Sequence, residues 1–397
     1  MIVLRAVLLL AVFAASAMAA PPALSEIGSP SGAGAAEPFL FAMREGGLLL
    51  SWLEPASNAK ETALRFATYR GGRWSEARTI VQRADFFVNW ADFPSVVEDA
   101  KGTLFAHWLQ KSGSDVYAYD VRIATSKDGG RTWSASLLLN RDGKKGEHGF
   151  ATLVPLPAGG VAATWLDGRN MVEGKEEGEM TIRYATLDGG GALRADLQLD
   201  ARTCECCTTG MTLAGGRPVI AYRDRSADEV RDVAVVRETA KGWTSPRLLR
   251  ADGWKIAGCP VNGPQLDARG ARVVAAWFTG ANEQGKVYVS FSDDAGATFG
   301  PALAIDDGKP VGRVDVVMTG ADAAMVTWLE QTASGAELRA RRVPRNGKAG
   351  PSFKLAESTA ARGAGFARAA VVGQDIYVAW TGQAGTEKRV HVTRVRF

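Results

Sequence analysis

A short apolar run that ends in an aromatic residue recurs seven times along the chain, and this repeat limits the folds available to the sequence. Each run is four or five residues long, rich in Val, Ala and Leu, and flanked by Gly, Asp or Asn, which is typical of β-strands. Similar apolar runs precede and follow it, as at 93–97 and 121–125. The aromatic residues, spaced by 51 to 57 positions, are Trp52, Trp108, Trp165, Tyr222, Trp277, Trp328 and Trp380.

Units of three or four strands repeated at this spacing predict a β-propeller in which each unit is one blade. Seven units therefore predict an all-β, seven-bladed propeller. The last unit ends at Phe397 without room for a fourth strand. We expect the segment from Ala23 to Ile27 to supply that strand, so that one strand from each end of the chain closes the ring.

The first 20 residues have the composition of a secretory signal peptide. One positive charge, Arg5, precedes an apolar run from Ala6 to Ala15, and small residues follow up to Ala20. The run is too short to span a bilayer, and no later run approaches the required length. We therefore expect cleavage near Ala20, one propeller domain over 21–397, and a monomeric protein in the periplasm or outside the cell, without a membrane anchor.

The charge balance argues against a nucleic-acid-binding protein. The chain has 47 Lys and Arg against 43 Asp and Glu, and the basic residues are scattered along it. Such a chain lacks the polybasic surface that attracts nucleic acids or anionic membranes. With 46% hydrophobic residues and 45 glycines, it has the composition of a globular, turn-rich protein.

Two units carry the same turn motif, Ser-x-Asp-x-Gly-x-Thr-aromatic. The two copies are Ser126 to Trp133 and Ser292 to Phe299, and Thr186 to Gly190 is an incomplete third copy. The motif predicts a hairpin in which the Asp accepts hydrogen bonds from the turn, a Gly supplies a positive φ, and the aromatic residue packs between sheets. It resembles the Asp box, or BNR repeat, of sialidases and related propellers.

This resemblance implies a location for the active site and an activity. In the sialidase family the Asp boxes lie on the face opposite the active site, and the propeller has six blades, so a six-bladed ring is the alternative to seven. The chain lacks the family's Arg-Ile-Pro motif, so no residue here can be matched to the family's arginine triad. The resemblance implies a sialidase-like glycoside hydrolase that requires no cofactor.

The face opposite the Asp boxes should collect the loops that enter each blade and those that follow each second strand, where most unusual polar residues fall. We expect this face to bind a glycan or a small acidic ligand. Arginine is the natural donor to a carboxylate, because guanidinium binds it bidentately. The candidate ligand-binding residues are Trp90, Arg223, Arg225, Asn262, Arg313, Asp315 and Arg362.

Three residues on this face are candidates for catalysis. Asp92 or Glu229 would serve as acid or base, and Tyr222, which replaces the tryptophan of the repeat, would be the nucleophile, since sialidases use a tyrosine. The alternatives without a functional role are that the charged run 223–232 is a solvated loop and that Trp90 only packs between blades.

Three of the four cysteines lie in the segment Cys204-Glu205-Cys206-Cys207, and the fourth, Cys259, opens the next unit. This grouping indicates a local site rather than a disulfide framework. In an extended segment Cys204 and Cys206 would share one side, and Cys207 would face the other. Adjacent Cα atoms, about 3.8 Å apart, are too close for an unstrained disulfide. We therefore expect one cysteine of the segment to reach Cys259.

The chemistry of these cysteines has three alternatives. An oxidising compartment favours a disulfide to Cys259. Clustered thiolates, with His148 or Asp92 nearby, would instead suit a soft ion such as copper(I) or zinc(II), although no standard zinc spacing is present. The third alternative is a reactive free thiol. The function is accordingly either glycan binding and hydrolysis or non-enzymatic metal handling or redox-linked chemistry, and a purely structural role for the face is the remaining alternative.

Overall fold

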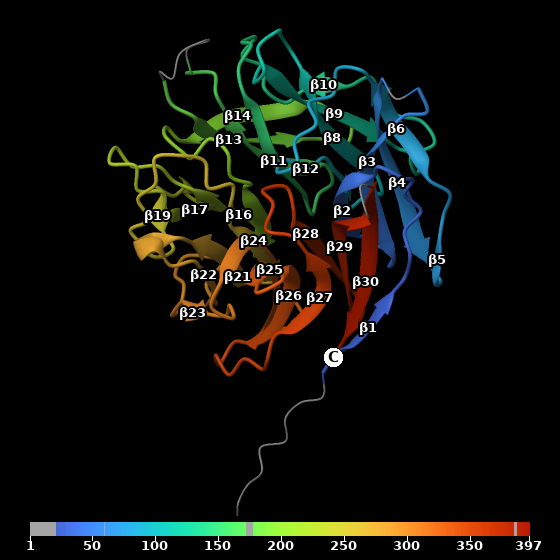
Figure 1. Cartoon of the computed structure of the whole chain (residues 1–397). Coiled ribbons are helices and arrows are strands. Elements are labelled where there is room, and N and C mark those ends of the chain that lie inside the picture. The colour runs from blue at the N-terminus through green and yellow to red at the C-terminus, as the bar shows by residue number, and fades with distance from the viewer. Residues whose placement is uncertain (1–20, 59, 172–177, 385–386) are drawn as a thin grey trace, which may run out of the picture.

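Each of the seven sequence units forms one antiparallel sheet, and the sheets stand around a central axis as the blades of a β-propeller (Figure 1). The computed structural model describes residues 21–58, 60–171, 178–384 and 387–397. The prediction of seven blades is confirmed, and the six-bladed alternative is wrong. The predicted signal peptide lies outside the described residues.

In each blade the first strand of the unit is the innermost. Blade 1 has β2 (Ala36–Ala42), β3 (Leu48–Pro55), β4 (Thr62–Arg70), β5 (Arg73–Trp74) and β6 (Arg78–Arg83); blade 2 has β7 (Ser95–Glu98), β8 (Leu104–Lys111), β9 (Tyr119–Ser126) and β10 (Leu137–Leu138). Blade 3 has β11 (His148–Pro155), β12 (Val161–Asp167), β13 (Thr181–Leu187) and β14 (Leu193–Asp200); blade 4 has β15 (Gly210–Ala214), β16 (Arg217–Arg223), β17 (Val233–Thr239), β18 (Gly242–Trp243) and β19 (Arg247–Leu248). Blade 5 has β20 (Gln265–Arg269), β21 (Arg272–Thr279), β22 (Lys286–Ser292) and β23 (Leu303–Ala304); blade 6 has β24 (Pro310–Met318), β25 (Ala323–Thr332), β26 (Gly335–Pro344) and β27 (Phe353–Ser358). Blade 7 has β28 (Ala367–Val372), β29 (Asp375–Ala384), β30 (Glu387–Arg396) and β1 (Ala23–Glu26).

Blade 7 is built from both ends of the chain. Strand β1 pairs antiparallel with β30, so that Ala23 lies opposite Arg396 and Glu26 opposite Thr393 (Figure 1). The backbone N–H of Ile27 continues this pairing by donating to Val392 at 3.0 Å. The predicted closure of the ring is therefore confirmed.

Helices contribute almost nothing to the described residues. The single helical element there is a 3₁₀ turn, η1 (Ala281–Glu283). Within the same ranges, no helix has the length and apolar character needed to cross a membrane.

The repeat tryptophans fill the space between neighbouring blades, and their indole N–H groups are satisfied in a recurring way. Trp52, Trp165 and Trp328 are fully buried, and each donates to the carboxylate two residues further along its strand at 2.6–2.7 Å. A buried donor without a partner would cost about 1–3 kcal/mol. This need explains why an acidic residue follows the aromatic residue at this spacing in three blades.

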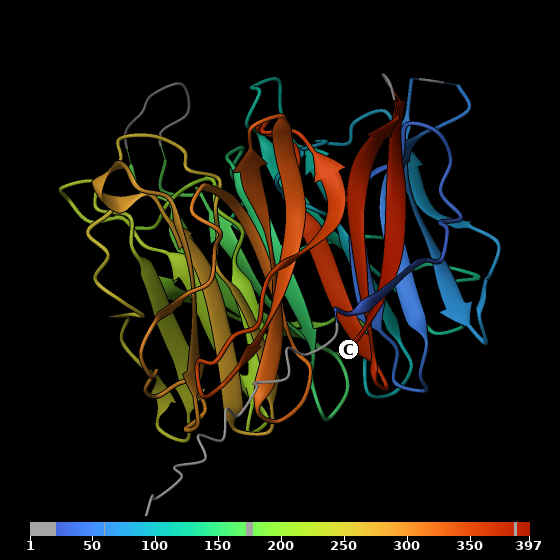
Figure 2. The ribbon, with the colours of Figure 1, turned by 60° about the horizontal axis from the view of Figure 1, so that its bottom comes forward.

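The two Ser-x-Asp turns connect third and fourth strands. Asp128 accepts hydrogen bonds from the backbone N–H of Thr132 and from its hydroxyl, and Asp294 does the same with Thr298. Because the strands are antiparallel, the loops that enter the innermost strands lie at the opposite end of the blades (Figure 2). We call that end the entry face; it includes loops 84–94, 201–209, 249–264 and 359–366.

Candidate functional site

A turn at Glu205 and Cys206 brings three thiols together on the entry face. Cys204 Sγ lies 3.5 Å from Cys207 Sγ and 3.9 Å from Cys206 Sγ, and all three sulfurs lie within 4.8 Å of one another. The expectation that Cys207 faces away from the other two is wrong, because the segment is not extended. Its start is fixed by the backbone N–H of Cys204, which donates to Arg223 at 3.0 Å, and the chain then turns back on itself.

The fourth thiol reaches this group from blade 5. The side chain of Cys259 interacts with that of Cys206 and is exposed, whereas Cys204 and Cys207 are 1% and 2% exposed. All four cysteines are free thiols. The sulfur separations of 3.5 and 3.9 Å exceed the length of a disulfide bond, about 2.05 Å. The expected approach of Cys259 to the segment is thus present, while the expected disulfide is not formed.

Hydrogen-bond donors point at the buried sulfurs. Arg231 Nη1 donates to Cys204 Sγ at 3.2 Å, and the backbone N–H of Asn262 donates to Cys207 Sγ at 3.4 Å. Burial opposes ionisation of Cys207, but the thiols of Cys204 and Cys206, the guanidinium of Arg223 and the Asn262 N–H together hold its pKa well below its ordinary range. Burial raises the pKa of Cys204 to about 11. Of the three thiols in the segment, Cys207 is therefore the one that ionises most readily.

Two buried guanidinium groups lie close to Cys207. Arg223 is 2% exposed and Arg313 is 6% exposed, and neither forms an ion pair with a carboxylate of the described residues. Each interacts with the charge of Cys207. A buried cation is costly unless a nearby anion offsets its loss of water. Ionisation of Cys207 would supply this compensation.

These two arginines donate their hydrogen bonds to backbone oxygens, most of which belong to neighbouring blades. The oxygens that accept from Arg223 belong to Arg231, Asn262 and Phe278, and those that accept from Arg313 belong to Val261 and Arg362. The side chain of Asn262 bonds Pro260, Val311 and the backbone N–H of Arg313. The sequence predicts ligand contacts from Arg223, Arg313 and Asn262, but the structure places their polar groups in bonds that join blades 4, 5, 6 and 7.

A network of ion pairs adjoins the cysteines. Arg231 bridges Glu205 at 2.7 Å and Glu229 at 2.9 Å, and Arg225 pairs with the same two carboxylates. The hydrogen bond from Arg225 is the main reason that the pKa of Glu229 falls to about 2. Glu229 is therefore an ionised partner in this network, not the protonated acid that catalysis would need, and Arg225 is engaged rather than free for a ligand.

The predicted nucleophile is enclosed. Tyr222 is 1% exposed, and its hydroxyl donates to Asp200 at 2.5 Å. Burial and the Asp200 carboxylate keep the pKa of Tyr222 well above its ordinary range. Tyr222 takes the place of the repeat tryptophan in the packing as well as in the sequence, which explains why it cannot reach a ligand on the face.

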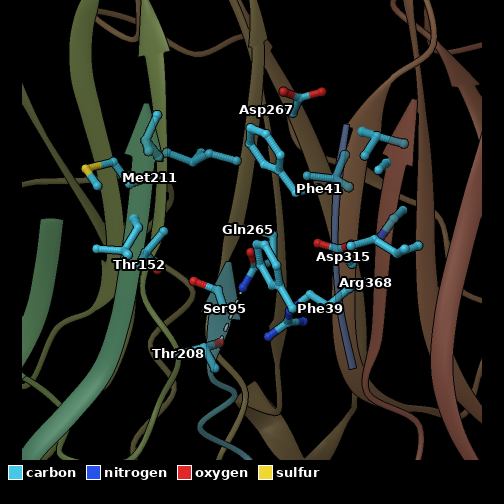
Figure 3. A pocket seen from close by; sticks show the side chains of 18 of the residues that line it. Phe39, Phe41, Ser95, Thr152, Thr208, Met211, Gln265, Asp267, Asp315 and Arg368 are labelled. Atoms are coloured by element: carbon cyan, nitrogen blue, oxygen red, sulfur yellow. Dashed lines mark hydrogen bonds between the residues drawn. The ribbon is translucent and has the colours of Figure 1, made fainter. Parts of the chain in front are cut away.

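Asp92 and Asp315 line the central channel beneath the entry face. A cavity of about 370 Å³ runs there between the innermost strands, and Figure 3 shows Asp315, Arg368 and Asp267 among its lining residues. The carboxylates of Asp92, Asp267 and Asp315 each accept a hydrogen bond from a backbone N–H of another blade. The acceptor and donor pairs are Asp92 with Phe150, Asp267 with Met318 and Asp315 with Ala369. The two acids that the sequence places at the ligand site thus join adjacent blades.

Burial in the channel makes the contribution of these carboxyls to folding stability depend on pH. It raises the pKa of Asp92 to about 7 and that of Asp315 to about 6. A carboxyl whose folded pKa exceeds the unfolded value of about 3.9 favours the folded state when protonated, so its contribution to stability is lost as pH rises from about 4 to about 7.

We expect Asp92→Asn to remove this loss. The amide oxygen can still accept from Phe150, and the free energy of unfolding of the variant relative to the parent should rise between pH 4 and pH 8, by up to about 4 kcal/mol for a shift of three pKa units. Urea unfolding of both proteins at several pH values measures this. A constant difference across the range would contradict it.

Trp90 and Arg362 lie at the rim of the entry face. Arg362 is exposed, stacks over the Trp90 ring at 5.8 Å and donates to the backbone oxygen of Cys259 at 3.4 Å. Trp90 also packs against Phe366, with ring centroids 6.0 Å apart. Of the predicted ligand-binding residues, Arg362 is the one that is exposed beside a cysteine, and Trp90 is partly buried in contact with it.

His148 belongs to a different cluster. It is completely buried, its Nε2 lies 3.0 Å from Asp142, and its Nδ1 lies 3.1 Å from the backbone oxygens of Tyr119 and Gly146. Asp167 completes the group and is held by Arg169 at 2.7 Å. Because His148 is fixed by these partners, it does not join the sulfurs, contrary to the expectation that it lies near enough to share a metal.

Sequence reasoning missed three residues around the cysteines: Arg231, Glu205 and Glu147. Glu147 accepts from the Tyr119 hydroxyl at 2.9 Å, and burial raises its pKa to about 7. Glu205 lies inside the cysteine segment, and Arg231 lies in the charged run that follows β16. Both residues can be read from the sequence, but a run of alternating charges does not show which of its arginines will point toward the cysteines.

Comparisons with known proteins establish the fold and no more. No protein-family model matches the chain, and no curated protein matches it in sequence. Similar solved structures include the α-L-arabinofuranosidase Arb93A of Fusarium graminearum in complex with an iminosugar inhibitor (12% identity, 95% of this chain and 97% of that chain, TM-score 0.52) and the polysaccharide lyase Uly1 (10% identity, 90% and 89%, TM-score 0.54).

The phage phi92 endosialidase is a third similar structure (8% identity, 95% of this chain and 69% of that chain, TM-score 0.53). At such low identities the likeness concerns the propeller fold alone. The resemblance to sialidases that the Ser-x-Asp turns indicate therefore holds at the level of this fold, which the chain shares with several propellers named for their action on glycans.

Proposed function

We propose that the protein binds a soft d¹⁰ metal ion, copper(I) or zinc(II), through the thiolates of Cys204, Cys206 and Cys207, in the periplasm or outside the cell. The observation that carries this proposal is the convergence of the three sulfurs to within 4.8 Å of one another. Thiolates are the ligands that select such ions.

The spacing of the sulfurs suits an ion at their centre. With a metal–sulfur bond of about 2.3 Å, two sulfurs are about 3.8 Å apart in a tetrahedral site and about 4.0 Å apart in a trigonal one. The observed separations are 3.5 and 3.9 Å. An ion could therefore enter with little change in the loop.

The surroundings suit the charge that such a complex would carry. Three thiolates around a monovalent or divalent cation leave a net negative charge, and Arg223, Arg231 and Arg313 lie around it. The N–H groups of Arg231 and Asn262 that point at sulfur would orient the ligands, as outer partners do in metal sites. Binding would release the protons held by Cys204 and Cys206.

A second candidate is a glycan or small acidic ligand on the same face, bound in the manner of an exo-sialidase substrate. It is favoured by the exposed guanidinium of Arg362 over the Trp90 ring, since an aromatic platform beside a cation suits an acidic sugar. The similar propellers named for glycan hydrolysis or cleavage support it by analogy of fold. Because Tyr222 is buried and cannot act as the nucleophile, this candidate function is limited to binding without hydrolysis.

Metal analysis of the protein purified under reducing, oxygen-free conditions tests the main proposal. We expect one copper or zinc ion per chain after reconstitution, with competition against a chromophoric chelator giving the affinity. A fully reduced protein that binds neither ion would overturn the proposal. For the second candidate, calorimetric titration with acidic oligosaccharides should show binding that Arg362→Ala removes.

A further inference from the structure

The four thiols differ sharply in their access to solvent. Cys204 and Cys207 are 1% and 2% exposed, Cys206 is partly buried, and Cys259 is exposed. If an ion is held by the three sulfurs of loop 201–209, two of its ligands are inaccessible to solvent. The remaining side is that of Cys206, where Cys259 stands.

Cys259 is adjacent to the cluster without being part of it. It interacts with Cys206 but does not belong to the set of sulfurs that all lie within 4.8 Å of one another. Because Cys206 contacts Cys204 and also interacts with Cys259, an ion could pass between the two sets while remaining bound to Cys206. Such a shared ligand lets one metal–sulfur bond be exchanged at a time.

The loop that carries Cys259 is fixed to the protein after this residue and exposed to solvent before it. Asn262, three residues on, is buried and bonded to the backbone of blade 6, whereas Ala257, Gly258 and Cys259 are exposed. Arg362 adds an exposed positive charge directly beside Cys259, to whose backbone oxygen it donates. An approaching ligand with a negative charge would be favoured at this position.

We infer that Cys259 is the exchange thiol of the site, through which the ion is received from and delivered to an anionic thiol carrier; this rests on the proposed metal-binding function. In delivery, the sulfur of the carrier forms a bond to the ion bound by Cys206 and Cys259, and the bond to Cys259 breaks. The proton of the incoming thiol passes to Cys259. A second carrier thiol then displaces Cys206 in the same way and gives its proton to that sulfur, so that the ion leaves on the carrier. The oxidation state of the ion does not change.

The test uses the full chain loaded with copper(I) and measures transfer of the ion to a chromophoric chelator in the presence of glutathione, an anionic thiol. We expect Cys259→Ser to retain one ion per chain, with an affinity within about threefold of the parent, and to transfer it at least tenfold more slowly. Arg362→Gln should slow transfer through glutathione about threefold or more and leave transfer through the neutral thiol 2-mercaptoethanol unchanged.

The outcomes separate the two proposals. A Cys259→Ser chain that loses the ion would make Cys259 a required ligand and overturn its role in exchange, while metal binding by the parent would stand. Unchanged transfer rates in Cys259→Ser would also overturn the role in exchange. A parent protein that binds no ion would overturn both proposals.

Discussion

Replacing both Cys204 and Cys207 by serine is expected to lower the affinity for copper(I) or zinc(II) by at least about 1000-fold. Structural zinc sites with four ligands bind with about 10–16 kcal/mol, so the loss of two thiolates removes more than the roughly 4 kcal/mol that this factor represents. A serine hydroxyl is a poor ligand for a soft ion. Chelator competition on the reduced proteins measures the change.

The matched control is Thr208→Ser in the same segment. Thr208 Oγ1 accepts from Gln265, and a serine hydroxyl can do the same, so this variant should bind metal as the parent does. Thermal melts without metal show whether the cysteine variant is folded. If the folded double variant kept its ion, the ligands would lie elsewhere, and the cysteine cluster would have to be interpreted as a structural feature.

Arg223→Met is expected to destabilise the folded protein by about 3–5 kcal/mol, the range seen when one partner of a buried charged contact is removed. The substitution leaves the backbone oxygens of Asn262, Arg231 and Phe278 without their buried donor. It also removes the guanidinium that stacks on Trp254 at 4.7 Å. Denaturant unfolding of the metal-free protein gives the free energy.

Arg217→Met is the control for this prediction, because Arg217 begins the same strand, β16, and is exposed. Surface substitutions of this kind usually change stability by less than about 0.5 kcal/mol. Equal stabilities of the Arg223 and Arg217 variants would show that the bonds between blades 4 and 5 contribute little. The same Arg223→Met protein, if it can be refolded at low temperature, should bind metal more weakly, since it lacks a positive charge near Cys207.

The sequence by itself determined the architecture. Seven aromatic-ended runs at regular spacing define seven blades, and a last unit too short for its fourth strand requires one from the N-terminus, which β1 supplies. These features are readable because strand periodicity and turn chemistry are local properties of the chain. The bonds of Asp128 and Asp294 within their turns depend on neighbours in sequence in the same way.

Only the tertiary structure decided which polar residues face a ligand. Arg223 bonds Asn262, 39 residues away, and Arg313 bonds Val261, 52 residues away, so their burial depends on how neighbouring blades meet. A guanidinium that binds a carboxylate and one that joins two blades look alike in sequence, because both need only a position at the end of a strand. Cys204, Cys206 and Cys207 were recognisable as a group, but their convergence required the turn at Glu205 and Cys206, which follows the backbone bonds of Thr203 and Cys204 to the end of β16 and the next residue. Distant contacts fix the environment of each of these side chains, and the environment determines what the side chain can do.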